Sequence, residues 1–132
     1  MPIKIYKPTS DGRRHSSVDA FSDITKTKPE KSLIVFLTPN SGRNNQGVIT
    51  VRHQGAGVKK FYRMVDFKLA KFDIEATVTA IEYDPNRGPR IALVEYTDGV
   101  KSYVLAPEGM KVGDKFLSSQ KAIEAKPGNR MP

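Results

Sequence analysis

The stretch Ile91-Ala92-Leu93-Val94-Glu95-Tyr96-Thr97-Asp98-Gly99-Val100-Lys101-Ser102-Tyr103-Val104-Leu105-Ala106 decides the fold class of this chain of 132 residues. Its two halves, 91–97 and 100–106, are rich in apolar, β-branched and aromatic residues. They flank Asp98-Gly99, a dipeptide typical of tight β-hairpin turns. We therefore predict two antiparallel strands joined by a type I′ turn.

Similar short runs lie on both sides of this hairpin. Residues 33–37, 48–53, 61–67, 76–83 and 115–118 combine β-branched or alternating apolar residues with flanking Gly, Pro, Asn or Asp. Short strands with turn signals about every ten residues are typical of small barrels and sandwiches. We predict an all-β fold, a small OB-type barrel of five to six strands, with an SH3-like barrel as the alternative.

The two ends of the chain lack this pattern. Residues 1–32 have no sustained helix or strand period, although 18–24 would suit a single helical turn, and the last residues are rich in Pro and Gly. The sequence therefore predicts an extended basic N-terminal arm (1–47), an OB-like barrel (48–120) and a linker (121–132). We expect residues 1–32 to be disordered until a partner orders them.

The charge is unevenly distributed. The formal net charge is +8, and residues 1–71 hold 14 Lys and Arg against 5 Asp and Glu, while the remainder holds 8 against 9. A strongly basic half favours a polyanionic partner. The longest aliphatic run, 33–37, is far too short to span a bilayer, so we expect no membrane partner. With no cysteine, disulfides and thiolate metal sites are excluded.

The most basic segment is 41–63. It contains Arg43, Arg52, Lys59, Lys60 and Arg63 without a single acidic residue, and glycines and amide side chains alternate with these cations. Glycine lets backbone N–H groups approach phosphates closely. This combination favours nucleic-acid contact over a merely solvated surface.

The sequence offers no catalytic constellation. Its only histidines are His15 and His53, and it contains no nucleophile-elbow or P-loop motif. Four acids near strand ends, Asp66, Asp73, Glu82 and Asp84, are expected to be solvated. We predict no enzyme activity, no metal site and no cofactor.

Several motifs carry a family resemblance: Gly12-Arg13-Arg14, Ser41-Gly42-Arg43-Asn44-Asn45, Ile49-Thr50-x-Arg52-His53, Tyr62-Arg63-x-x-Asp66-Phe67-Lys68 and Ile81-Glu82-Tyr83-Asp84-Pro85-Asn86-Arg87. With further matches at 24–33, 103–107 and 111–114, they cover essentially the whole chain. The sequence resembles the bacterial or organellar form of the second protein of the large ribosomal subunit. One departure is Val58, which stands where the family usually has histidine and removes a polar ring from one expected RNA contact.

The resemblance implies an OB-fold barrel with an N-terminal extension that binds large-subunit ribosomal RNA and supports subunit assembly, in a cytoplasmic or an organellar ribosome. Family members continue into an SH3-like domain and a C-terminal extension that are absent here. We therefore expect a fragment or one half of a split protein. Its expected partners are the rRNA, neighbouring ribosomal proteins and a separate chain that carries the missing half.

The candidate RNA-binding residues fall into three groups. Seven cations are expected to meet phosphates: Arg43, Arg52, Lys59, Lys60, Arg63, Lys68 and Lys71. Four side chains would read RNA shape, 2′-hydroxyls or an unstacked base: Asn44, Asn45, His53 and Tyr62. Three more cations lie in the matching motifs: Arg13, Arg14 and Arg87.

A second hypothesis is a free-standing OB module that binds single-stranded nucleic acid or tRNA. Such modules stack bases on aromatic side chains. It predicts several exposed aromatic rings on one face, whereas the basic segment contains only Phe61 and Tyr62.

Overall fold

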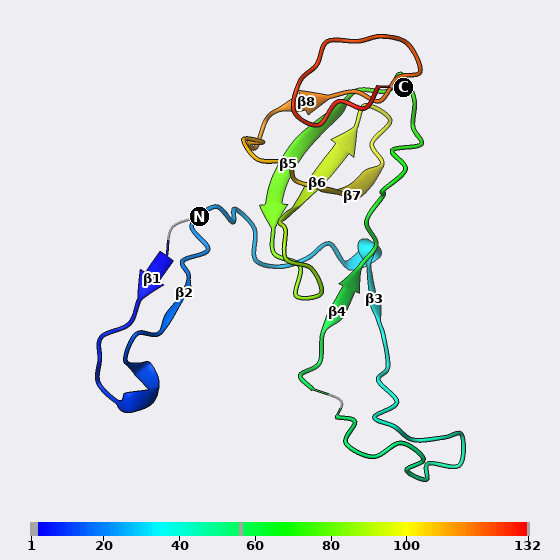
Figure 1. The fold of residues 1–132 in the computed structure, drawn as a ribbon. Helices are drawn as coiled ribbons and strands as arrows, with labels where there is room; N and C mark the ends of the chain where they lie inside the picture. The colour runs from blue at the N-terminus through cyan, green and yellow to red at the C-terminus, as the bar shows by residue number, and fades with distance from the viewer. Residues whose placement is uncertain (1–2, 56, 132) are drawn as a thin grey trace.

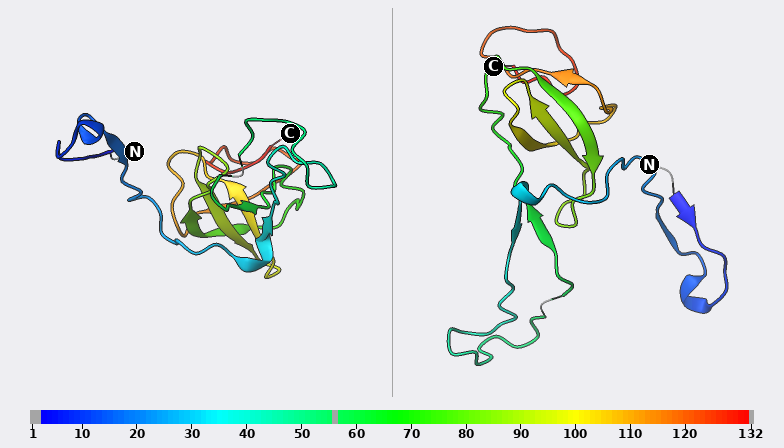
Figure 2. Two further views of the ribbon diagram at one scale, coloured as in Figure 1. Left: turned by 90° about the horizontal axis from the view of Figure 1, so that it is seen from below. Right: turned by 180° about the vertical axis from the view of Figure 1, so that it is seen from behind.

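The computed structural model describes residues 3–55 and 57–131, and it consists of short strands, turns and two 3₁₀ turns (Figures 1 and 2). Three antiparallel sheets are present: a hairpin of β1 and β2, a ribbon of β3 and β4, and a four-stranded sheet in the order β7-β6-β5-β8. The elements are β1 (Ile3–Ile5), η1 (Asp11–Arg13), β2 (Ser17–Asp19), η2 (Lys31–Leu33), β3 (Ile34–Phe36), β4 (Phe61–Arg63), β5 (Ala76–Glu82), β6 (Ile91–Tyr96), β7 (Lys101–Leu105) and β8 (Lys115–Phe116).

The four-stranded sheet buries side chains on both faces. On one face Val78, Val94 and Phe116 belong to one core cluster, and on the other Leu93 and Tyr103 belong to a second. A β-bulge in β5, between Val78 and Ala80, shifts its register against β6. Because one extra residue reverses the alternation of side chains, the bulge lets β5 contribute to both clusters.

Residues 65–73 bridge the open side of this curled sheet. At one edge, Val65 forms a parallel bridge with Tyr103, and Asp66 N donates to the Tyr103 carbonyl at 2.8 Å. At the other edge, Asp73 N donates to the Ser118 carbonyl at 2.8 Å. The result is a half-barrel of four strands closed by an irregular segment, which confirms the predicted all-β, OB-type fold.

The hairpin at 91–106 is confirmed, but its predicted turn type is wrong. Gly99 N donates to Tyr96 O at 2.8 Å, and Tyr96 N donates to Val100 O at 3.0 Å. Gly99 has a φ of +77°, whereas Asp98 is not among the residues with positive φ. Because a type I′ turn needs positive φ at both central residues, the chain instead makes a three-residue loop with glycine in the left-handed region.

The ribbon of β3 and β4 extends from the barrel and ends in a long irregular tip, 37–60 (Figure 1). The strand predicted at 48–53 is wrong, because only Ile49 pairs there, in a bridge with Arg43. Val48, Ile49 and Val51 are all exposed, so their alternation has no core to face. The strand predicted at 61–67 is likewise shorter, because β4 ends at Arg63.

The N-terminal residues form a hairpin that projects from the barrel separately from the ribbon (Figure 2). The helical turn predicted at 18–24 is wrong. Val18 pairs with Lys4 in the hairpin, and the chain then turns at Phe21, which has a φ of +53° and accepts a hydrogen bond from Ile24 N at 3.3 Å. The predicted disorder of residues 1–32 in the absence of a partner, and the boundaries predicted at 47 and 120, stay predictions.

The end of the described chain folds back on the barrel. Ser118 bridges Arg130, and Leu117 N donates to the Asn129 side chain at 2.8 Å. Gly128, with a φ of +96°, lies where an added Cβ would come 2.7 Å from Met110 Cε. Within the described residues, no helix has the length and apolar character needed to cross a bilayer.

Candidate nucleic-acid interface

The ribbon tip carries exposed cations with no acid nearby in the sequence. Residues 31–65 contain no Asp or Glu, and Arg43, Arg52, Lys59 and Lys60 are all exposed. Arg43 Nη1 donates to the Ser41 carbonyl at 3.1 Å, which directs its guanidinium along the loop. The ribbon therefore presents uncompensated positive charge, the electrostatic pattern of a nucleic-acid contact.

The shape of the tip depends on Asn44 and Gly42. Asn44 Oδ1 accepts hydrogen bonds from the N–H groups of Gln46 and Val48, both at 3.0 Å. The Gly42 carbonyl accepts Val51 N at 3.1 Å, and an added Cβ on Gly42, whose φ is +70°, would lie 2.1 Å from Val51 O. The Asn44 oxygen, predicted to contact RNA, thus orders the loop.

Two other predicted contacts of the tip are placed at its surface. Asn45 and His53 are exposed, and His53 has a φ of +63°. Lys59 lies against the aromatic rings at the base of the tip, with its Nζ 4.8 Å from the Phe36 centroid and 5.4 Å from the Phe61 centroid. Cation–π contacts of this kind hold the ammonium group in place while it stays accessible.

Three of the predicted RNA-binding cations, two of them predicted phosphate contacts, are instead bonded by groups of the protein itself. Arg63 is only 8% exposed, and its Nη1 donates to the Phe61 carbonyl at 2.7 Å. Lys71 Nζ lies 2.5 Å from Asp98 Oδ2, and this hydrogen bond lowers the pKa of Asp98. Arg63, one of the cations expected to meet phosphates, is therefore buried, because the short strand β4 turns this side chain toward the barrel.

Arg87, the third, is held by a buried acid. Its guanidinium pairs with Asp84, which has no exposed surface, and its Nη2 donates to the Tyr62 hydroxyl at 2.8 Å. Burial works against the charge of Arg87, but the hydrogen bonds to Asp84 and Tyr62 outweigh it and raise its pKa. Tyr62, predicted to read an unstacked base, is thus occupied by Arg87, whose Cζ lies 4.8 Å from the ring centroid.

Two acids predicted to be solvated are buried. Glu82 and Asp84 are 1% and 0% exposed. Glu82 accepts a hydrogen bond from the Tyr103 hydroxyl at 2.7 Å, and Lys26 Nζ lies 3.6 Å from its other oxygen. Their sequence positions at the end of β5 suggested solvent, but each is paired with a cation: Glu82 with Lys26 from a distant segment, and Asp84 with Arg87 three residues further along the chain.

The N-terminal hairpin contributes a second, smaller basic surface. Arg13 and Arg14 are exposed, with the Arg13 guanidinium 4.6 Å from the Tyr6 ring centroid and Arg14 only 4.0 Å from Asp11. Lys68 is also exposed, on the segment that closes the barrel. These three predicted contacts are therefore accessible, but they do not lie on the ribbon.

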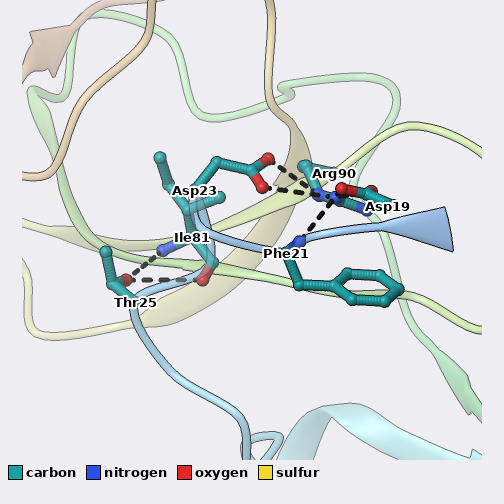
Figure 3. Close-up of polar contacts among 6 residues, drawn as sticks. All are labelled: Asp19, Phe21, Asp23, Thr25, Ile81 and Arg90. Atoms are coloured by element: carbon teal, nitrogen blue, oxygen red, sulfur yellow. Dashed lines mark hydrogen bonds and ion pairs between the residues drawn. The ribbon is translucent and has the colours of Figure 1, made fainter. Parts of the chain in front are cut away.

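Sequence reasoning missed Arg90, which fastens the hairpin to the barrel (Figure 3). Its Nε donates to Asp23 at 2.8 Å, and its Nη2 also pairs with Asp19. Beside them, Thr25 N donates to Ile81 O at 3.0 Å and Ile81 N donates to Thr25 Oγ1 at 2.8 Å. No local sequence motif predicts these contacts, because Arg90 and Ile81 lie more than fifty residues from their partners.

The charges of this contact support each other. The pKa of Asp19 is lowered by the N–H of Phe21 and by Arg90, and the pKa of Asp23 is lowered chiefly by Arg90. The Arg90 guanidinium also lies 5.1 Å from the Phe21 ring centroid and 5.8 Å from that of Tyr83. Arg90 is therefore a structural clamp and is unavailable to a ligand.

Among the described residues, no group of three or more His, Cys, Asp or Glu side chains is placed to hold a metal ion. What the fold does present is a small barrel with a basic, acid-free ribbon projecting from it. This arrangement defines a nucleic-acid-binding β-domain.

The family model described as "Ribosomal Proteins L2, RNA binding N-terminal domain" matches residues 30–118. The chain therefore belongs to the ribosomal protein L2 family, with the match on its RNA-binding N-terminal domain. The matched range contains the whole ribbon and the half-barrel, and it begins after the N-terminal hairpin. Membership carries a ribosomal RNA-binding role and a place on the ribosome.

Proposed function

We propose that the protein is a structural component of the large ribosomal subunit, that it binds large-subunit rRNA mainly through the tip of the ribbon, and that it supports assembly of that subunit beside neighbouring ribosomal proteins. The observation that carries this proposal is the ribbon itself. Arg43, Arg52, Lys59 and Lys60 are exposed on a segment without acids. Such a surface suits the closely spaced phosphates of folded RNA.

The N-terminal hairpin and Lys68 would add contacts of the same kind. Phosphate contacts position a protein on RNA and carry no sequence information by themselves. Arg13 and Arg14 lie on a hairpin that the Arg90 clamp attaches to the barrel. Two basic projections attached to one barrel would recognise the shape of a folded RNA.

The first test is the salt dependence of binding to a large-subunit rRNA transcript. Five to seven phosphate contacts predict a slope of log K against log[salt] of about −3.5 to −6, because each neutralised phosphate releases counterions. Filter binding between low and moderate salt measures it. A slope near zero would remove the electrostatic basis of the proposal.

The second test locates the contact. Changing Arg43, Arg52 and Lys60 together to Ala should weaken binding at least tenfold and flatten the slope by about 2 to 3, since three counterion-releasing contacts are lost. The matched control changes Lys111 and Lys115 to Ala, both exposed and on the barrel. Equal losses in the two variants would mean that net charge alone, rather than the ribbon, drives binding.

A third measurement separates the ribosomal component from a free-standing single-strand binder. Sedimentation of a cell lysate through a sucrose gradient should place the chain with large subunits and their precursors at physiological salt. A chain that stays at the top of the gradient while still binding RNA would favour the alternative.

A further inference from the structure

A groove lies at the base of the ribbon tip, between its two arms. Its volume is about 350 Å³, and its lining includes Phe36, Leu37, Val58, Lys60 and Asn86. This volume falls in the range of about 300–1,000 Å³ that is typical of small-ligand sites. The groove belongs to the family-matched domain. Of its lining side chains, Tyr62 is already engaged, because its hydroxyl accepts a hydrogen bond from Arg87 of the buried Arg87–Asp84 pair.

The lining of the groove is apolar and exposed. Phe36 is 43%, Leu37 58% and Val58 82% exposed. Single exposed apolar residues are ordinary, but a contiguous group in a hollow marks a binding surface. The flat ring of Phe36 at the end of β3 offers a surface on which a planar group can stack.

The rim of the groove is cationic. Lys59 and Lys60 both line it, and Lys59 Nζ is held 4.8 Å from the Phe36 centroid. No acidic residue lies between Glu30 and Asp66 in the sequence. An occupant that combines a planar ring with a negative charge is therefore favoured over an apolar or basic peptide.

Asn86 supplies a polar group at the same place. Its Nδ2 donates to the Phe61 carbonyl at 3.0 Å, which fixes the amide. No described residue donates to its Oδ1, so this oxygen can accept an N–H from the edge of a base.

We propose that this groove holds one unpaired nucleotide of the bound RNA, whose base stacks on Phe36 while Lys59 and Lys60 meet the adjacent phosphates. Each of the two rings in the groove has a cation beside it, Lys59 at Phe36 and Arg87 at Tyr62. Phe36 is the better stacking surface, because Tyr62 is less exposed and its hydroxyl is also bonded by Arg87. Stacking on an aromatic side chain tolerates any base, so the groove would recognise an extruded nucleotide rather than a sequence. This inference rests on the proposed RNA-binding function and adds a specific site to it.

The test uses the full chain and two RNA hairpins that differ by one nucleotide. One stem is fully paired, and the other carries a single bulged 5-iodouridine. The chain should bind the bulged hairpin more tightly, and irradiation should cross-link the bulged base to Phe36. Removal of an aromatic stacking partner typically weakens binding by about 5- to 150-fold, so the preference for the bulge should fall in that range.

Phe36→Leu should abolish both the preference and the cross-link while leaving affinity for the paired hairpin unchanged. The matched control is Phe72→Leu, since Phe72 is 37% exposed and also lies under a cation, Arg130, at 5.5 Å. If Phe36→Leu fails to fold, Val58→Asp gives the same test, because a carboxylate on this exposed side chain repels the nucleotide without disturbing a core.

Equal affinity for the two hairpins would overturn the groove proposal but would leave the proposed binding of ribosomal RNA standing. Equal affinity is also the result expected if the groove binds a peptide instead of a nucleotide. A preference or a cross-link that survives Phe36→Leu would overturn it as well. Failure to bind either hairpin or a large-subunit rRNA transcript would overturn the proposed function itself.

Discussion

The hydroxyl of Tyr103 joins the barrel to the root of the ribbon, and its removal should measurably destabilise the fold. Tyr103 is 0% exposed on β7. Its hydroxyl donates to Glu82 Oε2 at 2.7 Å and accepts the N–H of Glu30 at 2.8 Å. Glu30 is the residue just before η2 and β3, so this one group connects two barrel strands to the start of the ribbon.

The expected loss of stability follows from the two hydrogen-bond partners of the Tyr103 hydroxyl, Glu82 and the Glu30 N–H. A hydrogen bond to a charged group contributes about 1.5–3 kcal/mol, and a buried donor left without an acceptor costs about 1–3 kcal/mol. Tyr103→Phe leaves Glu82 Oε2 and the Glu30 N–H without these hydrogen bonds, so we expect a loss of about 2–4 kcal/mol in the free energy of unfolding. Burial, together with the nearby carboxylate, raises the pKa of Tyr103, so the hydroxyl remains a donor throughout the working pH range.

Equilibrium unfolding in urea, followed by circular dichroism, measures this loss. With a denaturant dependence of about 2 kcal/mol per molar, the midpoint should fall by about 1–2 M. Tyr96→Phe is the control, because Tyr96 is also buried but its hydroxyl makes no hydrogen bond with the described residues. If Tyr103→Phe shifts the midpoint no more than Tyr96→Phe does, the hydroxyl does not connect ribbon and barrel as argued.

Three further outcomes are expected. Arg90→Met should release the N-terminal hairpin, so that its amides exchange at least about fivefold faster while those of β6 are unchanged; equal protection would show that the clamp contributes little. In the folded protein the pKa values of Asp19 and Asp23 lie below the ordinary 3.8. The stabilisation by the clamp is therefore fully present above pH 3.8 and should be lost as the pH falls through the pKa values of the folded state. The side-chain NMR signal of Arg90 measures this loss. Gly42→Ala forces a Cβ into a main-chain oxygen and should weaken RNA binding without lowering the melting temperature of the barrel, whereas Gly12→Ala, with open space around it, should change neither.

The strands of the barrel could be predicted because their residue types favour strands and the fold buries the same residues in a core. The runs at 76–83 and 91–106 are rich in β-branched and aromatic residues, and both faces of β6 are covered. The run at 48–53 has the same alternation but lies on a projecting loop. Alternation of apolar and polar residues predicts a strand only where the apolar side faces a hydrophobic core. The sequence alone does not show which runs face that core.

The exposure of the cations in the ribbon tip could be predicted from the sequence, whereas that of the candidate cations outside the tip could be predicted less well. The exposed cations of the tip were identified because no acid lies near them in sequence. Arg63, Lys71 and Arg87 are bonded by groups of the protein instead. Asp84 stands only three residues before Arg87 and could have been suspected as its partner, whereas the pairing of Lys71 with Asp98 depends on the fold. Phe36 was overlooked because it precedes the basic segment by several residues and meets Lys59 only through the pairing of β3 with β4.

The separation of these two sets of cations has a physical cause. An arginine that pairs with a buried acid, as Arg87 does with Asp84, stabilises the barrel, because leaving either charge alone in the interior is costly. The ribbon has no acid to pair with, and it exposes Val48, Ile49 and Val51 as well. The cations of the tip repel one another and these three apolar side chains remain in water, so neither feature stabilises the isolated protein. In the proposed complex the same features would become favourable, because phosphates would neutralise the cations and the RNA surface would cover the apolar residues. The composition of the ribbon therefore fits the proposed RNA-bound state, while the hydrogen bond from Glu30 N to the Tyr103 hydroxyl holds the root of the ribbon on the barrel.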